Sequence, residues 1–106
     1  MSWFFLVLAG LFEVVWASFM KQSAGFTRLF PSLITVVTML ASFGLLALAM
    51  RTLPLGTAYS IWTGIGAIGA FLVGILFFGE SLTVTRFLAA LLIVAGLVLM
   101  KFSSTD

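Results

Sequence analysis

The positions of the charged residues constrain this chain more than any other feature of its sequence. No charged residue lies between Arg28 and Arg51, or between Arg51 and Glu80, which are stretches of 22 and 28 residues. A helix of about 20 apolar residues crosses the hydrocarbon core of a bilayer. With 63% hydrophobic and 8% charged residues, the chain also lacks the charge that the surface of a soluble domain requires. The sequence therefore predicts a membrane protein.

The charges and the turn residues between them predict an all-α membrane protein with one domain, residues 1–106, and four transmembrane helices. Gly25 marks the first connection, Pro54 the second and residues 79–81 the third. The first span is not expected to be a secretory signal, because no basic residue precedes it and Glu13 interrupts it. The expected helices cover about residues 3–20, 30–50, 56–78 and 84–101.

The charge balance across these four spans predicts no fixed orientation in the membrane. The amino terminus, Arg51 and Lys101 fall on one side, and the other side has Lys21, Arg28 and Arg86. The positive-inside rule needs an imbalance to set topology, although one charge near a helix end can also decide it. We therefore expect insertion both ways and an antiparallel, dual-topology homodimer, since four helices barely enclose a cavity.

Glu13 is the one acidic residue inside an expected span. A carboxylate there costs on the order of 2.5–3.5 kcal/mol on insertion scales, and such residues are functional by default. No lysine or arginine lies at the same depth in any span, which argues against the alternative of a permanently paired structural acid. Because burial disfavours the charged form, Glu13 can hold a proton or a cation but not both. That competition is the minimal machinery of a proton/cation antiporter.

Small and hydrogen-bonding residues are expected around this carboxylate. Gly10 leaves room beside it on the same face of the first helix, and the indole of Trp16 can donate a hydrogen bond to it unless Trp16 is an interfacial anchor. The hydroxyl of Ser42 can donate either to the carboxylate or back to its own helix. The other residues expected to line the site are Thr38, Met39, Phe43 and Thr63.

The third and fourth spans add aromatic and small residues. Tyr59 and Trp62 lie three residues apart on one face. Such a pair is more often packing or an interfacial belt, but beside a lone acid it suits cation–π binding of a small cation. Gly64 and Gly66 lie within one turn and are a candidate hinge, and Gly66, Ala70 and Gly74 form a stripe for close packing. In the fourth span, the residues expected at a dimer seam are Ala89 and Gly96.

Several classes of function are excluded. The chain has no phosphate loop, nucleophile elbow or metal-ligand spacing, and it has no histidine or cysteine. We therefore expect no enzyme, no metal site and no cofactor apart from protons as the coupling ion. Five scattered basic residues form no nucleic-acid-binding stripe. Three hypotheses remain: a proton-coupled exporter of organic cations, a small channel, and an interaction subunit whose Glu13 pairs with a basic residue of a partner.

Three stretches together resemble the small multidrug resistance family. They are residues 12–17 (FEVVWA), 25–32 (GFTRLFPS) and 54–67 (PLGTAYSIWTGIGA), and the resemblance covers essentially the whole chain. It implies a four-helix protomer in an antiparallel homodimer of the bacterial inner membrane. It also implies proton-coupled export, in which Glu13 alternately binds protons and substrate.

Other positions resemble the guanidinium-exporter branch of that family. These are Trp16, Ser42 with Met39 before it, residues 62–67 and Lys101. The branch that exports polyaromatic drugs typically has glycine at the position of Trp16 and tyrosine at that of Met39, and glycine where this chain has Ala89. Guanidinium is planar and binds carboxylates bidentately. We expect two Glu13 side chains, braced by Trp16 and Ser42, to bind it with Tyr59 and Trp62. Export of quaternary ammonium or other cationic drugs is the alternative.

Overall fold

The computed structural model describes residues 1–103 and contains four long helices in that part of the chain. Each helix begins and ends within two residues of its predicted bounds. Every one is long and apolar enough to cross a membrane, which confirms the four predicted spans. The helices are α1 (Ser2–Gln22), α2 (Leu29–Ala49), α3 (Leu55–Phe77) and α4 (Val84–Ser103).

A tight turn joins α1 to α2. The buried hydroxyl of Ser23 donates to the carbonyl of Met20 at 2.7 Å and accepts from the backbone N–H of Phe26 at 3.0 Å. Between them the backbone is left-handed at Ala24, Gly25 and Phe26, with φ of 50°, 74° and 67°. Only glycine adopts this conformation at little cost, so the predicted breaker at Gly25 lies at the centre of the turn.

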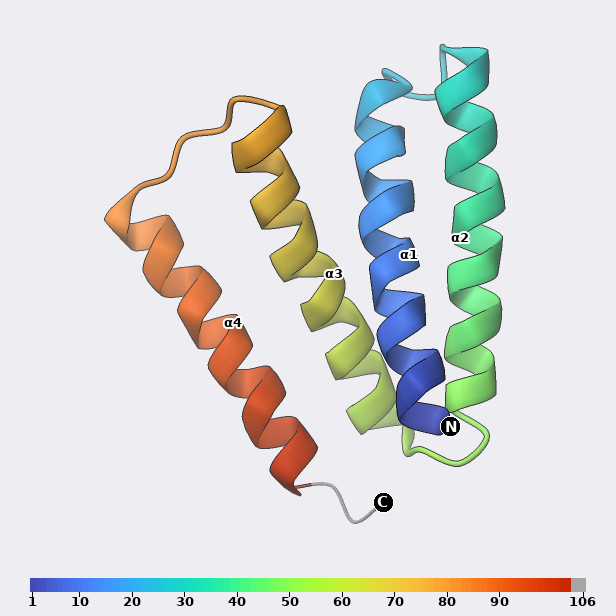
Figure 1. Cartoon of the computed structure of the whole chain (residues 1–106), viewed down its shortest axis with the longest axis vertical. Helices are drawn as coiled ribbons and strands as arrows, with labels where there is room; N and C mark the ends of the chain where they lie inside the picture. Colours follow the sequence, from blue (N-terminus) through green and yellow to red (C-terminus); the bar gives the residue numbers. More distant parts are fainter. Residues whose placement is uncertain (104–106) are drawn as a thin grey trace.

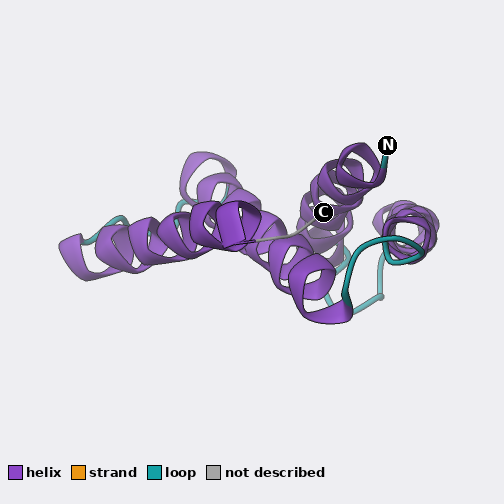
Figure 2. Cartoon of the chain, turned by 90° about the horizontal axis from the view of Figure 1, so that it is seen from below, coloured by secondary structure: helices purple, strands orange, loops and turns teal. Residues whose placement is uncertain are grey.

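The four helices run alternately in opposite directions (Figure 1). The amino terminus and the end of α4 therefore lie at one end of the molecule, and the α1–α2 and α3–α4 connections lie at the other. The helices form an open array rather than a closed bundle. α1 packs between α2 and α3, whereas α4 packs along α3. Seen from below, α4 lies away from α1 and α2 (Figure 2), and the molecule is flattened, with extents of 42 × 35 × 16 Å.

The buried core lies at the end where the chain begins. It comes from the first half of α1, the end of α2 and its following turn, and the start of α3. Towards the other end, α3 diverges from α1 (Figure 1). α4 contributes no buried residue, although the ammonium of Lys101 lies 4.2 Å from the ring centroid of Trp3 in a cation–π contact between α4 and α1. The core residues are Leu6, Ala9, Leu46, Ala49, Leu53, Ala58, Ile61 and Trp62.

Candidate functional site

Glu13 lies at the contact between α1 and α3. Gly66 of α3 is buried against it, and a Cβ atom at Gly66 would overlap the Glu13 carboxylate. The Glu13 side chain approaches α3 so closely here that only glycine fits, so the small-residue stripe of α3 makes room for the acid. The Oε1 atom of Glu13 is buried and has no hydrogen-bond partner among residues 1–103. The one ion pair in that range joins Arg86 to Glu80, so the carboxylate is not permanently paired within the described chain.

The indole of Trp16 lies one turn further along α1. Its Nε1 atom is buried and also lacks a hydrogen-bond partner within residues 1–103, so the expected hydrogen bond from Trp16 to Glu13 is not formed. Buried polar groups are almost always hydrogen-bonded in native proteins, and each exception needs an explanation. One free acceptor and one free donor, three residues apart on α1, mark this region as a place where a bound group can be held.

The hydroxyl of Ser42 connects three helices. It donates to the backbone carbonyl of Ala9 in α1 at 2.7 Å and accepts from the indole N–H of Trp62 in α3 at 3.0 Å. Both sequence-based alternatives for this hydroxyl are therefore wrong, because it reaches neither the Glu13 carboxylate nor its own helix. In an α-helix the carbonyl of residue 9 also accepts the N–H of residue 13. Ser42 thus holds the turn of α1 from which Glu13 projects.

Four aromatic rings from three helices form a continuous row. Trp16 meets Phe43 edge-on at 6.3 Å between centroids, Phe43 lies 5.7 Å from Trp62, and Trp62 lies 5.5 Å from Tyr59. Trp62 is buried, whereas Phe43 and Tyr59 are 44% and 53% exposed. Ring faces of this kind attract cations. The structure therefore brings together the aromatic residues predicted for the site and leaves one side of the row open.

The other predicted lining residues have simpler surroundings. Thr38 donates to the carbonyl of Ile34 in its own helix at 2.7 Å, which satisfies its hydroxyl, and Met39 is half-buried. Thr63 is exposed and does not share the buried environment of Trp62. Gly10 faces Ile65 of α3, whose Cγ2 would lie 2.6 Å from an added Cβ, so its small size serves packing between α1 and α3 rather than space beside Glu13.

The predicted hinge and dimer residues are only partly explained by the single chain. Gly64 packs against the side chain of Leu97 in α4, and α3 continues as one helix through Gly64 and Gly66. Both glycines are therefore close-contact positions, and the hinge stays a prediction. Ala89 and Gly96 lie exposed on α4, with nothing within 4 Å of a Cβ at Gly96. Their role in dimer packing stays a prediction too.

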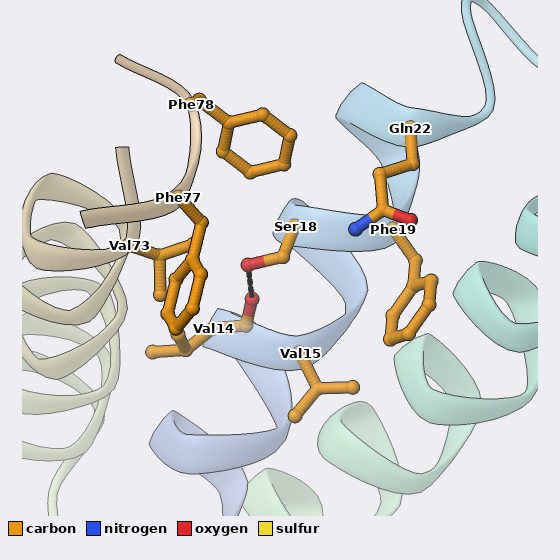
Figure 3. A pocket seen from close by; sticks show the side chains of 8 residues that line it. All are labelled: Val14, Val15, Ser18, Phe19, Gln22, Val73, Phe77 and Phe78. Carbon is orange, nitrogen blue, oxygen red and sulfur yellow. Dashed lines mark hydrogen bonds between the residues drawn. The ribbon is translucent and has the colours of Figure 1, made fainter. Parts of the chain in front are cut away.

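A cavity of about 350 Å³ opens where α3 diverges from α1 (Figure 3). The hydroxyl of Ser18 donates to the carbonyl of Val14 at 2.7 Å, so the walls of the cavity are largely apolar. The cavity begins at Val14, one residue after Glu13, and Glu13 itself is not among its lining residues. The sequence did not reveal it, because it depends on the angle between two helices. Its lining residues are Val14, Val15, Ser18, Phe19, Gln22, Val73, Phe77 and Phe78.

Comparison with known proteins identifies related sequences along nearly the whole chain. The family model described as Small Multidrug Resistance protein matches residues 1–94. A protein of Citrobacter freundii named Guanidinium exporter is 56% identical over 104 residues, covering 98% of this chain and 99% of the relative. Proteins of the same name from Salmonella typhimurium and Yersinia pseudotuberculosis are 56% and 54% identical over the same length. These relatives are similar to the chain along nearly its whole length.

Proposed function

The chain belongs to the small multidrug resistance family, and from this premise we propose that it exports guanidinium in exchange for protons. It is a multi-pass protein of the bacterial inner membrane and a transporter rather than an enzyme. The proposal of guanidinium as substrate is supported by relatives named Guanidinium exporter that are 54–56% identical. Protons are the coupling ion, and no other cofactor is needed.

The observation that carries the proposal is the environment of the Glu13 carboxylate. Its carboxylate lies inside a membrane-spanning helix, has one buried oxygen without a partner among the described residues, and faces a glycine of α3. Because burial penalises a bare charge, a proton and a cation compete for this carboxylate. Guanidinium N–H groups then donate to the two carboxylate oxygens as the proton leaves. Trp16 and Phe43 supply ring faces beside the bound cation.

A second copy of the chain completes the proposed site. The open array leaves Phe43 and Tyr59 exposed, and α4 has no buried residue. In an antiparallel homodimer, two Glu13 carboxylates face one cavity and bind one cation together. Alternating access follows if the two protomers exchange conformations, so that the cavity opens to each side of the membrane in turn. Two protons then leave for each guanidinium that binds.

The test is guanidinium transport by the purified protein in liposomes under an imposed proton gradient. We expect uptake driven by the gradient, abolished in Glu13→Gln and retained at a reduced rate in Glu13→Asp, which keeps a carboxylate but shortens its reach. Exchange of two protons for one cation moves net charge, so a voltage-sensitive dye should report it. Electrically silent exchange contradicts this stoichiometry, and proton-independent flux contradicts antiport.

Export of quaternary ammonium compounds is the second candidate. The largely apolar cavity between α1 and α3, which begins one residue after Glu13, favours it, because an alkyl substituent could extend into that space while the cationic head binds the carboxylate. The same assay separates the two candidates. If an alkyl ammonium is exchanged and guanidinium is not, the substrate assignment is wrong while the mechanism holds. If neither is exchanged by folded protein, the interaction-subunit hypothesis replaces both.

A further inference from the structure

A second carboxylate, Glu80, lies outside the site described above, at the end of α3. Gly79 has a left-handed backbone with φ of 68°, and the N–H of Glu80 donates to the carbonyl of Gly74 at 3.1 Å. This turn folds the Glu80 side chain back over α3. A Cβ atom added at Gly74 would lie 2.6 Å from the Oε1 atom of Glu80. The glycine thus leaves room for the carboxylate against the helix.

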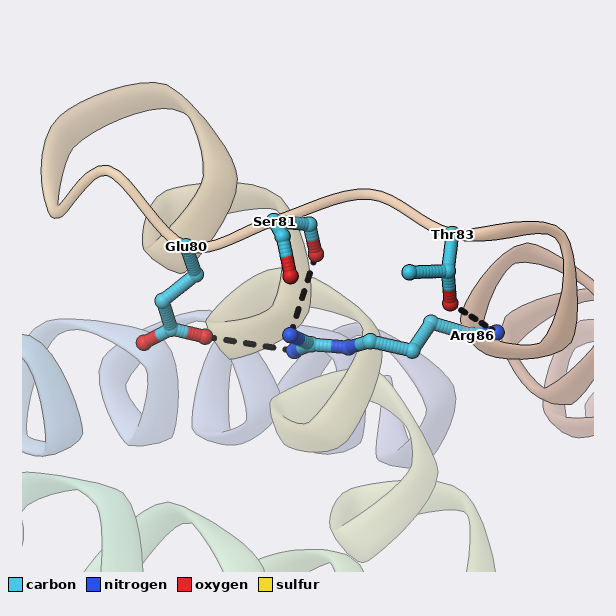
Figure 4. Close-up of polar contacts among 4 residues, drawn as sticks. All are labelled: Glu80, Ser81, Thr83 and Arg86. Carbon is cyan, nitrogen blue, oxygen red and sulfur yellow. Dashed lines mark hydrogen bonds and ion pairs between the residues drawn. The ribbon is translucent and has the colours of Figure 1, made fainter.

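Glu80 already holds a guanidinium group, that of Arg86 (Figure 4). The Nη2 atom of Arg86 lies 3.2 Å from Oε1 of Glu80, while Nη1 donates to the carbonyl of Ser81 at 3.0 Å. Arg86 also lies 5.6 Å from the ring centroid of Phe71. Among the described residues, Oε2 of Glu80 takes part in no hydrogen bond. The carboxylate therefore has an acceptor free, and Arg86 keeps two partners if this ion pair breaks.

The ion pair is easily exchanged. The side chains of Arg86 and Glu80 are 40% and 44% exposed, and such pairs contribute little to stability because solvent screens them. A free guanidinium ion has the same planar, donor-rich edge as the arginine side chain. A free guanidinium ion can therefore make the same contact with the Glu80 carboxylate that the Arg86 side chain makes.

Glu80 also lies at the open end of the contact between α1 and α3. Glu80 lines a cavity of about 120 Å³ together with Ala17, Lys21, Ala70 and Gly74. Ala17 and Lys21 are four and eight residues after Glu13 in α1, and Ala70 and Gly74 are four and eight after Gly66 in α3. Residues at this spacing lie on one helix face. The cavity therefore continues the Glu13–Gly66 contact, and eight residues of helix correspond to about 12 Å.

We propose that Glu80 is a capture site for guanidinium at the entrance to the path towards Glu13. This inference rests on the proposed function, since it adds a second site for the same substrate. The incoming ion displaces Arg86 from the carboxylate, and Arg86 stays on Ser81 and Phe71. Lys21 faces the same cavity from α1 and repels the captured cation, which limits how tightly Glu80 can hold it. In an antiparallel homodimer each face of the membrane has one such site.

The experiment compares three variants in the liposome assay by the substrate dependence of guanidinium uptake. Glu80→Gln removes the capturing charge and should raise KM about twofold to fivefold, the range expected of an exposed ion pair. Arg86→Gln removes the internal competitor and should lower KM by a similar factor. Arg28→Gln is the matched control, because it removes the same charge at the same end of the molecule, and so changes the charge balance across the membrane equally, but does not line the cavity. In dimers purified in detergent and reconstituted, its KM should stay that of the unmodified protein.

Opposite shifts in the first two variants distinguish capture from a structural ion pair. If Glu80 and Arg86 only stabilise the α3–α4 connection, both variants will shift KM in the same direction, and the proposal is overturned. An unchanged KM in Glu80→Gln also overturns it. Saturable guanidinium exchange by the unmodified protein tests the proposed function separately. If that exchange is observed and Glu80→Gln leaves KM unchanged, the capture site is rejected and the proposed function stands.

Discussion

Ser42 shows how one hydroxyl group can organise a site without touching its charged residue. It accepts the indole N–H of Trp62 and donates to the carbonyl of Ala9, and all three residues are buried. A serine on the small face of a helix was predictable as a hydrogen-bonding residue. Its partners were not, because they belong to helices whose positions depend on the tertiary structure.

Replacement of Ser42 by alanine should leave the buried indole N–H of Trp62 without an acceptor. We expect a loss of about 1–2 kcal/mol in the free energy of unfolding, as for a strong hydrogen bond between membrane helices, and weaker guanidinium transport because Trp62 is no longer held. Unfolding in a denaturing detergent measures the first effect. Thr38→Val is the control, since the Thr38 hydroxyl bonds only within α2, and an equal loss there would contradict the role given to Ser42.

Gly66→Ala should strongly slow transport while the chain still inserts. The added Cβ overlaps the carboxylate of Glu13, so either the acid must turn away or α1 and α3 must separate. We expect the rate of guanidinium exchange to fall more than tenfold, by analogy with other small displacements of functional groups. Gly44→Ala in α2 is the matched control, because nothing lies within 4 Å of its Cβ position. Normal transport by Gly66→Ala would show that Glu13 does not act from this contact.

At the scale of elements, α4 is the least integrated helix. It is apolar throughout its middle and has no buried residue, and it packs along α3 rather than against α1 or α2. At Gly64 of α3, the side chain of Leu97 fills the space that a Cβ would occupy. Because bilayer lipid is as apolar as leucine, such small-residue contacts are what bind one membrane helix to another.

This contact predicts coupled effects at Gly64 and Leu97. Gly64→Ala forces the leucine out of its place and should destabilise the protein by about 1 kcal/mol. Leu97→Ala creates space, so adding Gly64→Ala to it should cost much less than in the native background. Unfolding measurements on both single variants and the double variant give the coupling energy. Additive effects would mean that α4 does not pack on α3 through these two residues.

At the scale of the whole molecule, the two ends carry nearly equal positive charge. Arg51 and Lys101 lie at the end with the amino terminus, and Lys21, Arg28 and Arg86 lie at the other end. The alternating direction of the four helices agrees with this division, while orientation in the membrane stays a prediction. Because the two ends are so nearly balanced, one added positive charge is enough to favour one orientation in the membrane.

Single added charges should therefore select the orientation. Reporters fused to the carboxyl terminus, one active in the cytoplasm and one active outside it, should both work on the unmodified chain. Ser103→Arg should favour the orientation with both termini in the cytoplasm, and Gln22→Lys should favour the opposite one. In cells, where orientation is set at insertion, each variant alone should lose transport and regain it when the two are expressed together. Activity of only one reporter on the unmodified chain would contradict the antiparallel dimer.

The four spans and the turns between them follow from the amino-acid sequence, as does the prediction that Glu13 is a functional residue. Charge spacing and breakers are local signals, and the cost of a carboxylate in hydrocarbon depends on its neighbours along the chain. The tertiary structure decided which groups meet. Ser42 bonds to Ala9 and Trp62 instead of Glu13, Gly66 rather than Gly10 makes room for the acid, and a cavity opens where α3 leaves α1. These contacts depend on the angle and register between helices, which packing in three dimensions sets.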